Sequence, residues 1–299
     1  MILVVDAGNT NVVAACMEQD TVLYAKRYDT GKQEEASYHD RKLGEFFAEL
    51  QEKISWNGTS GKSMPCVESR ETGQEADLGS LAEGAVVSDG RMAEAARRYP
   101  VDGAIIASVV PSINGALQEA VQHWTGCEPL FVSARLDTGL QIRYDAPEKL
   151  GADLIAGAAG AVEQFGCPVI VVDIGTATTF AVVNGRKEYL GGAICPGPYT
   201  AFKGLTDRAS QLPEFSLDVT DEIIGTNTIN CMRIGALTGH AAMIDGMIDR
   251  ILAKLGEESV RLVVTGGPAK DIAPLCRHRL VYDGDLVLHG LWKLQQRNQ

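Results

Sequence analysis

Short apolar runs separated by polar or glycine-containing turns dominate the first thirty residues. The runs ILVVDAG, NVVAACME and TVLYAKRY are closely spaced and rich in β-branched residues, which predicts an antiparallel meander of three strands. Between residues 34 and 54 the period changes, because Leu43, Phe46, Phe47 and Leu50 recur at helical spacing. This segment is therefore predicted to be a helix with one buried face.

A polar segment over residues 56–88 interrupts this pattern. It is rich in Gly and Ser and has no apolar period, so we expect a loop or an insertion. Regular structure is predicted to resume with the strand GAIIASVV, the helix SINGALQEAVQHW and the strand PLFVS.

The second half of the chain repeats the plan of the first. After a helix expected to begin near Lys149, the run IVVDIGTATTFAVV matches LVVDAGNTNVVAAC in its order of apolar residues, Asp, Gly, and Asn or Thr. Helical segments over 225–255 and 285–297 flank the strand RLVVTGG. Two such units predict duplicated α/β halves, although a chance match of this length is the alternative.

Composition and charge exclude several classes of protein. The 299 residues carry a net charge of −12, which argues against nucleic acid as a partner because phosphate binding needs clustered Lys and Arg. No apolar run is long enough to span a bilayer. The seven cysteines include no CxxC pair, so we expect neither a disulfide framework nor a zinc site, and we predict a cytoplasmic protein.

The end of the first strand carries a group of residues suited to phosphate and metal. Gly8 permits close approach of a ligand to the backbone, and Asn9, Thr10 and Asn11 offer donors to phosphate oxygens. Asp6 is suited to Mg²⁺, which usually takes one or two carboxylates and then substrate phosphates. A polar hairpin turn is the alternative interpretation of this motif.

The second unit offers the same chemistry through Asp173, Gly175, Thr176, Thr178 and Thr179. A facing pair of such turns is more specific than either turn alone. In the run TGG, Gly266 and Gly267 present bare backbone against which a nucleotide base or ribose could lie, although a simple turn at a strand end fits equally well. The run GGAICPG at 191–197 is expected to form another turn bracketed by glycines.

The order of these motifs resembles the superfamily of acetate kinase, sugar kinases, heat-shock 70 proteins and actin. More closely, the chain resembles the type III pantothenate kinases along nearly its whole length, except at 56–88. The residues that carry the resemblance are the runs DAGNTN, SVVP, TGLQIRYDAP, GAD, DIGTATTF, YLGGAICPG, LP, IGTNT and VTGG.

The resemblance implies a fold, an activity and a site. The fold would be two duplicated ribonuclease-H-like (actin-like ATPase) domains, residues 1–134 and 148–299, with a cleft between them. The activity would be ATP-dependent phosphorylation of pantothenate, the first step of coenzyme A biosynthesis. It would need Mg²⁺ and a monovalent cation, K⁺ or NH4⁺, in a homodimer with the pantothenate pocket at the subunit interface.

Site residues follow from the same resemblance. Asp153 would be the general base, and the alternative is that it only caps the helix that begins there. Asp6 and Asp173 would serve the metal, and the two turns and the TGG run would bind ATP. The pantothenate pocket would be formed by Tyr144, Gly151, Ala152, Asp153 and Ala209.

Two positions depart from the family pattern. Leu154 stands where an arginine is expected to contact pantothenate, and Ala209 stands where a threonine is expected. Arg208, Lys203 or Ser210 could compensate. The alternative function is therefore a catalytically weak or inactive relative with an altered ligand or a regulatory binding role. An actin-like filament protein is disfavoured, because it would have no use for the pantothenate-kinase motifs.

Overall fold

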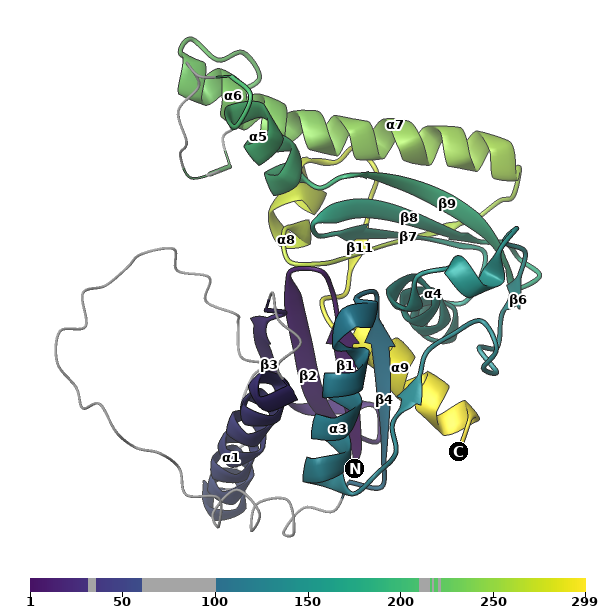
Figure 1. Ribbon diagram of the computed structural model, residues 1–299. Coiled ribbons are helices and arrows are strands. Elements are labelled where there is room, and N and C mark those ends of the chain that lie inside the picture. The colour runs from purple at the N-terminus through teal and green to yellow at the C-terminus, as the bar shows by residue number, and fades with distance from the viewer. Residues whose placement is uncertain (32–35, 61–100, 210–215, 217, 220–221) are drawn as a thin grey trace, which may run out of the picture.

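The computed structural model describes residues 1–31, 36–60, 101–209, 216, 218–219 and 222–299 (Figure 1). Most of the segment expected to be a loop or insertion, 61–88, lies outside the described residues. Its first part, 56–60, is helical rather than irregular, because α1 continues to Ser60. No helix in the described ranges has the combination of length and apolar character needed to cross a bilayer.

The first half of the chain forms a five-stranded sheet in the order β3-β2-β1-β4-β5. The predicted meander, the helix after it and the strand–helix–strand unit are all present. The elements are β1 (Ile2–Ala7), β2 (Asn11–Glu18), β3 (Thr21–Asp29), α1 (Ala36–Ser60), β4 (Gly103–Ser108), η1 (Pro111–Ile113), α3 (Asn114–Thr125) and β5 (Leu130–Phe131).

The second half forms a six-stranded sheet in the order β11-β10-β7-β8-β9-β6. Its elements are β6 (Gln141–Ile142), η2 (Pro147–Lys149), α4 (Ala152–Phe165), β7 (Val169–Ile174), β8 (Ala177–Val183), β9 (Glu188–Pro196), α5 (Pro198–Thr206), α6 (Thr228–Ala236), α7 (Thr238–Leu255), β10 (Arg261–Thr265), α8 (Ala269–Ile272), η3 (Ala273–Leu275), β11 (Val281–Tyr282) and α9 (Leu286–Arg297). Apart from β6, the order β9-β8-β7-β10-β11 reproduces that of the first sheet, so the predicted duplication is confirmed.

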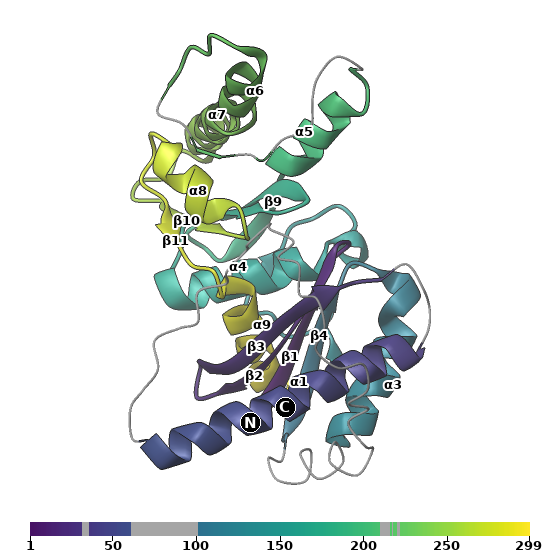
Figure 2. The ribbon, with the colours of Figure 1, turned by 90° about the vertical axis from the view of Figure 1, so that its left-hand side faces the viewer.

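The two sheets face each other across a middle layer made of α4 and α9 (Figures 1 and 2). Residues of both sheets and both helices share one apolar core there. A second core lies between the first sheet and α1 and α3, where Leu43, Phe46, Phe47 and Leu50 are all buried as predicted. A third core joins the second sheet to α7 and α8. The fold is thus five layers deep, with the two halves joined at the middle layer.

The small residues of α4 allow it to cross α9 at very short range. A Cβ on Gly290 would lie 1.9 Å from the carbonyl oxygen of Ala156, and a Cβ on Gly160 would lie 2.6 Å from that of Leu286. These distances leave no room for a side chain at either crossing position. The run of Ala and Gly after Asp153 is therefore explained by helix packing.

Two expectations from the sequence are wrong, and a third stays a prediction. The run 191–197 is not a turn, because β9 extends to Pro196 and only Gly197 follows it. The helical segment 225–255 is two helices that meet at Leu237. The division into residues 1–134 and 148–299 stays a prediction, and α9 at the end of the chain packs against β1 and β4 of the first sheet as well as α4.

Candidate active site

Asp6 and Asp173 occupy equivalent places in the two sheets. Asp6 is near the end of β1, where it pairs with Val13 of β2, and Asp173 is near the end of β7, where it pairs with Thr179 of β8. Side chains alternate between the faces of a strand, and Val4 and Val171, two residues earlier, belong to the core of the middle layer. Both carboxylates therefore lie on the face turned toward the other half.

In each half, the amide of the second residue after the aspartate donates a hydrogen bond that closes the turn, and the first turn is longer by one residue. The amide of Gly8 donates to the carbonyl of Asn11 at 2.9 Å, and the amide of Gly175 donates to that of Ala177, also at 2.9 Å. The hydroxyls of Thr10 and Thr176 are 2.9 Å apart and hydrogen-bond each other. The predicted facing pair of turns is therefore present, and the two turns meet directly.

The second turn is braced by residues that follow β9. A Cβ on Gly197 would lie 1.9 Å from the carbonyl oxygen of Gly175, so only glycine fits there. The hydroxyl of Thr200 donates to the carbonyl of Thr176 at 2.6 Å. Bracing of this kind keeps backbone groups in a fixed arrangement, as a phosphate site needs.

All of the predicted phosphate-binding residues except Thr178 are at least partly exposed. Asn9, Thr10, Thr176 and Gly267 are exposed, and Gly8, Asn11, Gly175, Thr179 and Gly266 are partly exposed. Thr178 is fully buried, and its hydroxyl lies 2.8 Å from Nε2 of His240 on α7. Because Thr178 and Thr179 are consecutive strand residues, only Thr179 shares the face of Asp173.

Gly266 lies directly against Asp173. Its φ is +96°, and a Cβ there would be 2.2 Å from the carbonyl oxygen of Ile174 and 2.6 Å from Oδ1 of Asp173. Glycine is therefore required at position 266, because the backbone there lies too close to the carboxylate of Asp173 for a side chain. Bare backbone beside it is compatible with the predicted nucleotide contact.

Asp153 lies in the first turn of α4, where the middle layer begins. Its Oδ1 accepts a hydrogen bond from the amide of Leu154 at 2.8 Å. A Cβ on Gly151 would lie only 2.5 Å from the same oxygen, so the carboxylate occupies the space that glycine leaves free. The N-cap of α4 is Gly151 and no side chain caps the helix, so Asp153, the second helical residue, is not the capping residue.

The charge of Asp153 acts on both Asp6 and Asp173. Burial, together with the charges of Asp153 and Asp173, raises the pKa of Asp6 to about 7. Burial and the charge of Asp153 raise the pKa of Asp173 to about 6. Burial also raises the pKa of Asp153, against the hydrogen bond from Leu154, which lowers it. The structure thus brings the predicted base and the two predicted metal carboxylates into one electrostatic site.

The predicted pantothenate residues are brought together except for one. Tyr144 lies beside Gly191 of β9, and the charges of Tyr144 and Asp153 both act on the buried Tyr189. Ala152 is buried and Gly151 is partly exposed at the start of α4. Ala209 lies apart, just beyond α5, where its amide donates to the carbonyl of Leu205, and no hydrogen bond joins it to Asp153 within the described part of the chain.

Sequence reasoning missed two residues near this site. Tyr189 is buried next to Tyr144, and its place in the run YLGGAICPG was the available signal. Arg27 on β3 lowers the pKa values of both Asp6 and Asp173. Nothing in its local sequence marks it, because its position depends on the register of two strand pairs.

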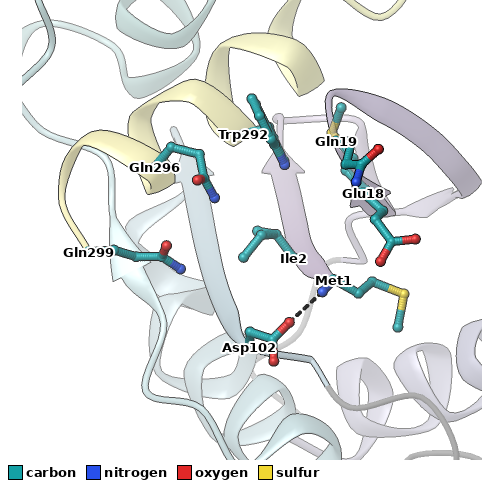
Figure 3. Close-up of a pocket in the computed structure, with 9 residues that line it drawn as sticks. Met1, Ile2, Glu18, Gln19, Asp102, Trp292, Gln296 and Gln299 are labelled. Atoms are coloured by element: carbon teal, nitrogen blue, oxygen red, sulfur yellow. Dashed lines mark hydrogen bonds and ion pairs between the residues drawn. The ribbon is translucent and has the colours of Figure 1, made fainter.

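A cavity of about 510 Å³ lies elsewhere, at the opposite end of β1 from Asp6 (Figure 3). Ile2, Met17 and Trp292 line it, and the amino group of Met1 pairs with Asp102 there at 2.5 Å. None of the predicted site residues lines this cavity, so it plays no part in the site built around the three carboxylates.

Comparison with known proteins decides the family. The model of the type III pantothenate kinase family matches residues 66–250. A type III pantothenate kinase from Halalkalibacterium halodurans is 30% identical over the full length of both chains. Another, from Thermomicrobium roseum, is 43% identical over 197 residues, which are 66% of this chain and 76% of the relative. The chain belongs to the type III pantothenate kinase family.

Solved structures agree on the fold. A protein from Campylobacter jejuni described as a Baf family transcriptional activator aligns over 98% of this chain and 96% of its own, with a TM-score of 0.53 and 15% identity. A ROK family glucokinase from Streptomyces griseus aligns over 98% and 99%, with a TM-score of 0.50 and 11% identity. The expected duplicated actin-like fold is confirmed.

Membership of the type III pantothenate kinase family also confirms the expected enzyme class, a kinase. No comparison favours the alternative of an inactive relative. That Leu154 and Ala209 depart from the family pattern stays a prediction.

Proposed function

We propose that this chain transfers the terminal phosphoryl group of ATP to the terminal hydroxyl of pantothenate, which gives 4′-phosphopantothenate. The observation that carries the proposal is the meeting of three carboxylates, one from each sheet and one from α4, beside two turns that touch through Thr10 and Thr176. Phosphoryl transfer needs mainly positioning and charge stabilisation, plus a group that accepts the hydroxyl proton.

Asp153 is the proposed base. Its raised pKa makes the ionised carboxylate a stronger proton acceptor than an ordinary aspartate. The hydroxyl of pantothenate would give its proton to Asp153 while its oxygen bonds to the γ-phosphorus. The bond from that phosphorus to the bridging oxygen breaks, and ADP leaves with the bond's electron pair. Gly151 supports this role because it leaves space for the carboxylate.

The residues fit the expected Mg²⁺. Burial and the charges of neighbouring carboxylates raise the pKa values of Asp6 and Asp173, and a divalent cation would relieve that repulsion. No group of three or more His, Cys, Asp or Glu in the described ranges could hold a metal without other ligands, which suits an ion that relies on substrate phosphates and water. Bound Mg²⁺ would neutralise charge on the phosphates. The dependence on K⁺ or NH4⁺ is proposed from the family alone.

A homodimer is the proposed assembly, and exposed apolar side chains on the second half support it. They lie on β9, α5, α6 and the segment before α6, and are Leu190, Ile194, Tyr199, Leu205, Ile223, Ile224 and Ile229. Ile194 and Ile224 are 71% and 80% exposed. Apolar surface gathered on one region usually marks an interaction site. We further propose a cytoplasmic location, since the six cysteines among the described residues are all free.

The departure at Leu154 gives a specific prediction. The side chain of Leu154 packs against the core of the middle layer, so it offers no cation to the carboxylate of pantothenate. We expect Leu154→Arg to lower the KM for pantothenate about tenfold or more, as a charge-assisted hydrogen bond contributes roughly 1.5–3 kcal/mol. Leu23→Arg on β3 adds the same charge elsewhere and should leave KM unchanged. An unchanged or higher KM in Leu154→Arg would show that another residue already holds that carboxylate.

The proposed activity is tested by coupled ADP release with the purified protein, ATP, Mg²⁺ and K⁺ or NH4⁺. We expect ADP release that depends on pantothenate, with 4′-phosphopantothenate identified by mass spectrometry. Replacement of K⁺ by Na⁺, and removal of Mg²⁺ with EDTA, should each reduce the rate. ADP release that is indifferent to pantothenate would reject the proposed substrate.

A further inference from the structure

Arg27 occupies a defined place on the face of the first sheet that is turned to the second half. Across the strands, Asp6 pairs with Val13 and Val13 pairs with Arg27. Side chains of directly paired residues share a face, and Val13 packs against the core of the middle layer. Arg27 therefore projects from the same face as Asp6, two strands and roughly 10 Å away along the sheet.

The guanidinium of Arg27 has no ion-pair or hydrogen-bond partner among the residues that the structure describes, and the residue is exposed. The preceding residue behaves differently. Lys26 points to the opposite face and pairs with Glu45 at 3.2 Å and Glu49 at 2.7 Å on α1. The strand thus places a paired cation on its outer face and an unpaired cation on the face of the active site.

The charge of Arg27 acts on both halves of the molecule. It lowers the pKa values of Asp6 in the first half and of Asp173 and Tyr282 in the second half. Tyr282 lies on β11 and pairs with Val264 of β10, the strand that ends one residue before Gly266. Arg27 is therefore a cation beside an acidic site, on the side where the TGG run presents its bare backbone.

The end of β3 is fixed to the first phosphate turn. The amide of Thr30 donates to the carbonyl of Thr10 at 3.0 Å, and the hydroxyl of Thr30 donates to the carbonyl of Gly8 at 2.6 Å. Thr30 is buried. Arg27 comes three residues earlier, so its backbone is held in register with the turn.

We propose that Arg27 binds the phosphate chain of the nucleotide as it passes between the two turns, a role that rests on the proposed function. A guanidinium forms paired hydrogen bonds with phosphate oxygens, and no described residue occupies the donors of Arg27. The ligand class is a nucleoside di- or triphosphate. Arg27 would offset the negative charge that Asp6, Asp153 and Asp173 present to those phosphates.

The test is nucleotide binding by isothermal titration calorimetry, without pantothenate, using the full chain. We expect Arg27→Gln to weaken binding of ATP about 10- to 100-fold, as loss of a charge-assisted hydrogen bond implies. AMP, which lacks the β- and γ-phosphates, should lose less than about threefold. Arg27→Lys should recover part of the affinity for ATP. A merely structural role would weaken AMP and ATP equally.

Arg135→Gln is the matched control, because Arg135 is an exposed cation that follows β5, at the other edge of the same sheet. It should leave both affinities unchanged. Unchanged affinity for ATP in Arg27→Gln, or equal losses for AMP and ATP, would overturn the proposal. Because binding is measured apart from turnover, an enzyme that binds ATP but does not phosphorylate pantothenate would reject only the proposed function.

Discussion

The two halves share one topology, but they differ at the strand that follows the aspartate-bearing hairpin. In the first half, β4 pairs with β1 so that Ala107 lies opposite Asp6. In the second half, β10 pairs with β7 so that Thr265 lies opposite Asp173. The next residue is Ser108 in one half and Gly266 in the other. Since the same fold accepts serine at this place, the glycine in the second half serves the site beside Asp173.

The two aspartate hairpins differ as well. The first turn is held by Thr30 from the neighbouring strand, whereas the second is packed against Gly197 and Thr200. The second half therefore has a tighter site, where Gly197 and Gly266 both lie too close to other backbone atoms to carry a side chain. The first half has the exposed side chains Asn9 and Thr10. The two halves thus share the carboxylate but differ in the residues that surround it.

Among the substitutions that test the difference between the two halves, Gly266→Ala is expected to lower the free energy of unfolding the most. A positive φ in a residue with a side chain costs roughly 1–2 kcal/mol, and the overlap with Ile174 and Asp173 adds roughly 1–3 kcal/mol. We expect a loss of about 2–5 kcal/mol in the free energy of unfolding, measured by urea denaturation. Phosphoryl transfer should fall as well, because the carboxylate of Asp173 is displaced.

Gly115→Ala in α3 is the control for that experiment. Nothing lies within 4 Å of its Cβ position, and alanine is favoured over glycine inside a helix by roughly 0.5–1 kcal/mol. It should therefore stabilise the protein slightly. If Gly266→Ala were equally harmless, the contrast between Gly266 and Ser108 would have no functional meaning.

Asp6→Asn is expected to change how stability depends on pH in the metal-free protein. The folded state raises the pKa of Asp6 from 3.8 to about 7, so the folded protein holds this proton more tightly than the unfolded chain. The free energy of unfolding should therefore fall as the pH rises from 4 to 7. Asn is never charged, so Asp6→Asn should be more stable than wild type at pH 8 by about 1–3 kcal/mol.

Urea denaturation at pH 4 and pH 8 measures this difference. The gain from Asp6→Asn should be small near pH 4, because the folded state is protonated there and the unfolded chain, with a pKa of 3.8, is about half protonated. Asp145→Asn, an exposed carboxyl before α4, is the control and should show no such trend. A pH-independent difference for Asp6→Asn would contradict the electrostatic account of the site.

Much of the fold could be predicted from the sequence, because strand and helix periods are local. The runs ending at Asp6 and Asp173 gave both hairpins, and the duplication followed from their similarity. The short run 191–197 was misassigned, since its glycines suggested a turn. In the structure, Gly192 sits in β9, where a Cβ would lie 1.5 Å from the carbonyl of Phe180. Only the tertiary arrangement shows that backbone approach is the reason for glycine.

The three carboxylates of the site could be predicted from the sequence, but not all of the residues around them. Thr178 was placed with the phosphate residues although Thr179 follows it, and strand alternation alone requires their side chains to point to opposite faces. Arg27 could not have been found, since its relation to Asp6 depends on two strand registers. The contact of Gly160 with α9 likewise needed the crossing of two helices.

The smallest predicted effect concerns the contact between the two turns. The hydrogen bond between Thr10 and Thr176 joins the halves at 2.9 Å, but both residues are exposed. In a double-mutant cycle with Thr10→Val and Thr176→Val, we expect a coupling of about 0.5–1 kcal/mol in the free energy of unfolding. A coupling of zero would mean that the turns do not meet in solution.

Asp153 is the proposed base, and its charge acts on the aspartates of both halves. The most direct measurement is single-turnover transfer of phosphate from ATP to pantothenate by Asp153→Asn, with Asp145→Asn as the matched control. We predict that Asp153→Asn is about 10²- to 10⁴-fold slower than wild type and still binds ATP, while Asp145→Asn transfers phosphate at the wild-type rate. Transfer by Asp153→Asn at the wild-type rate would show that Asp153 is not the base.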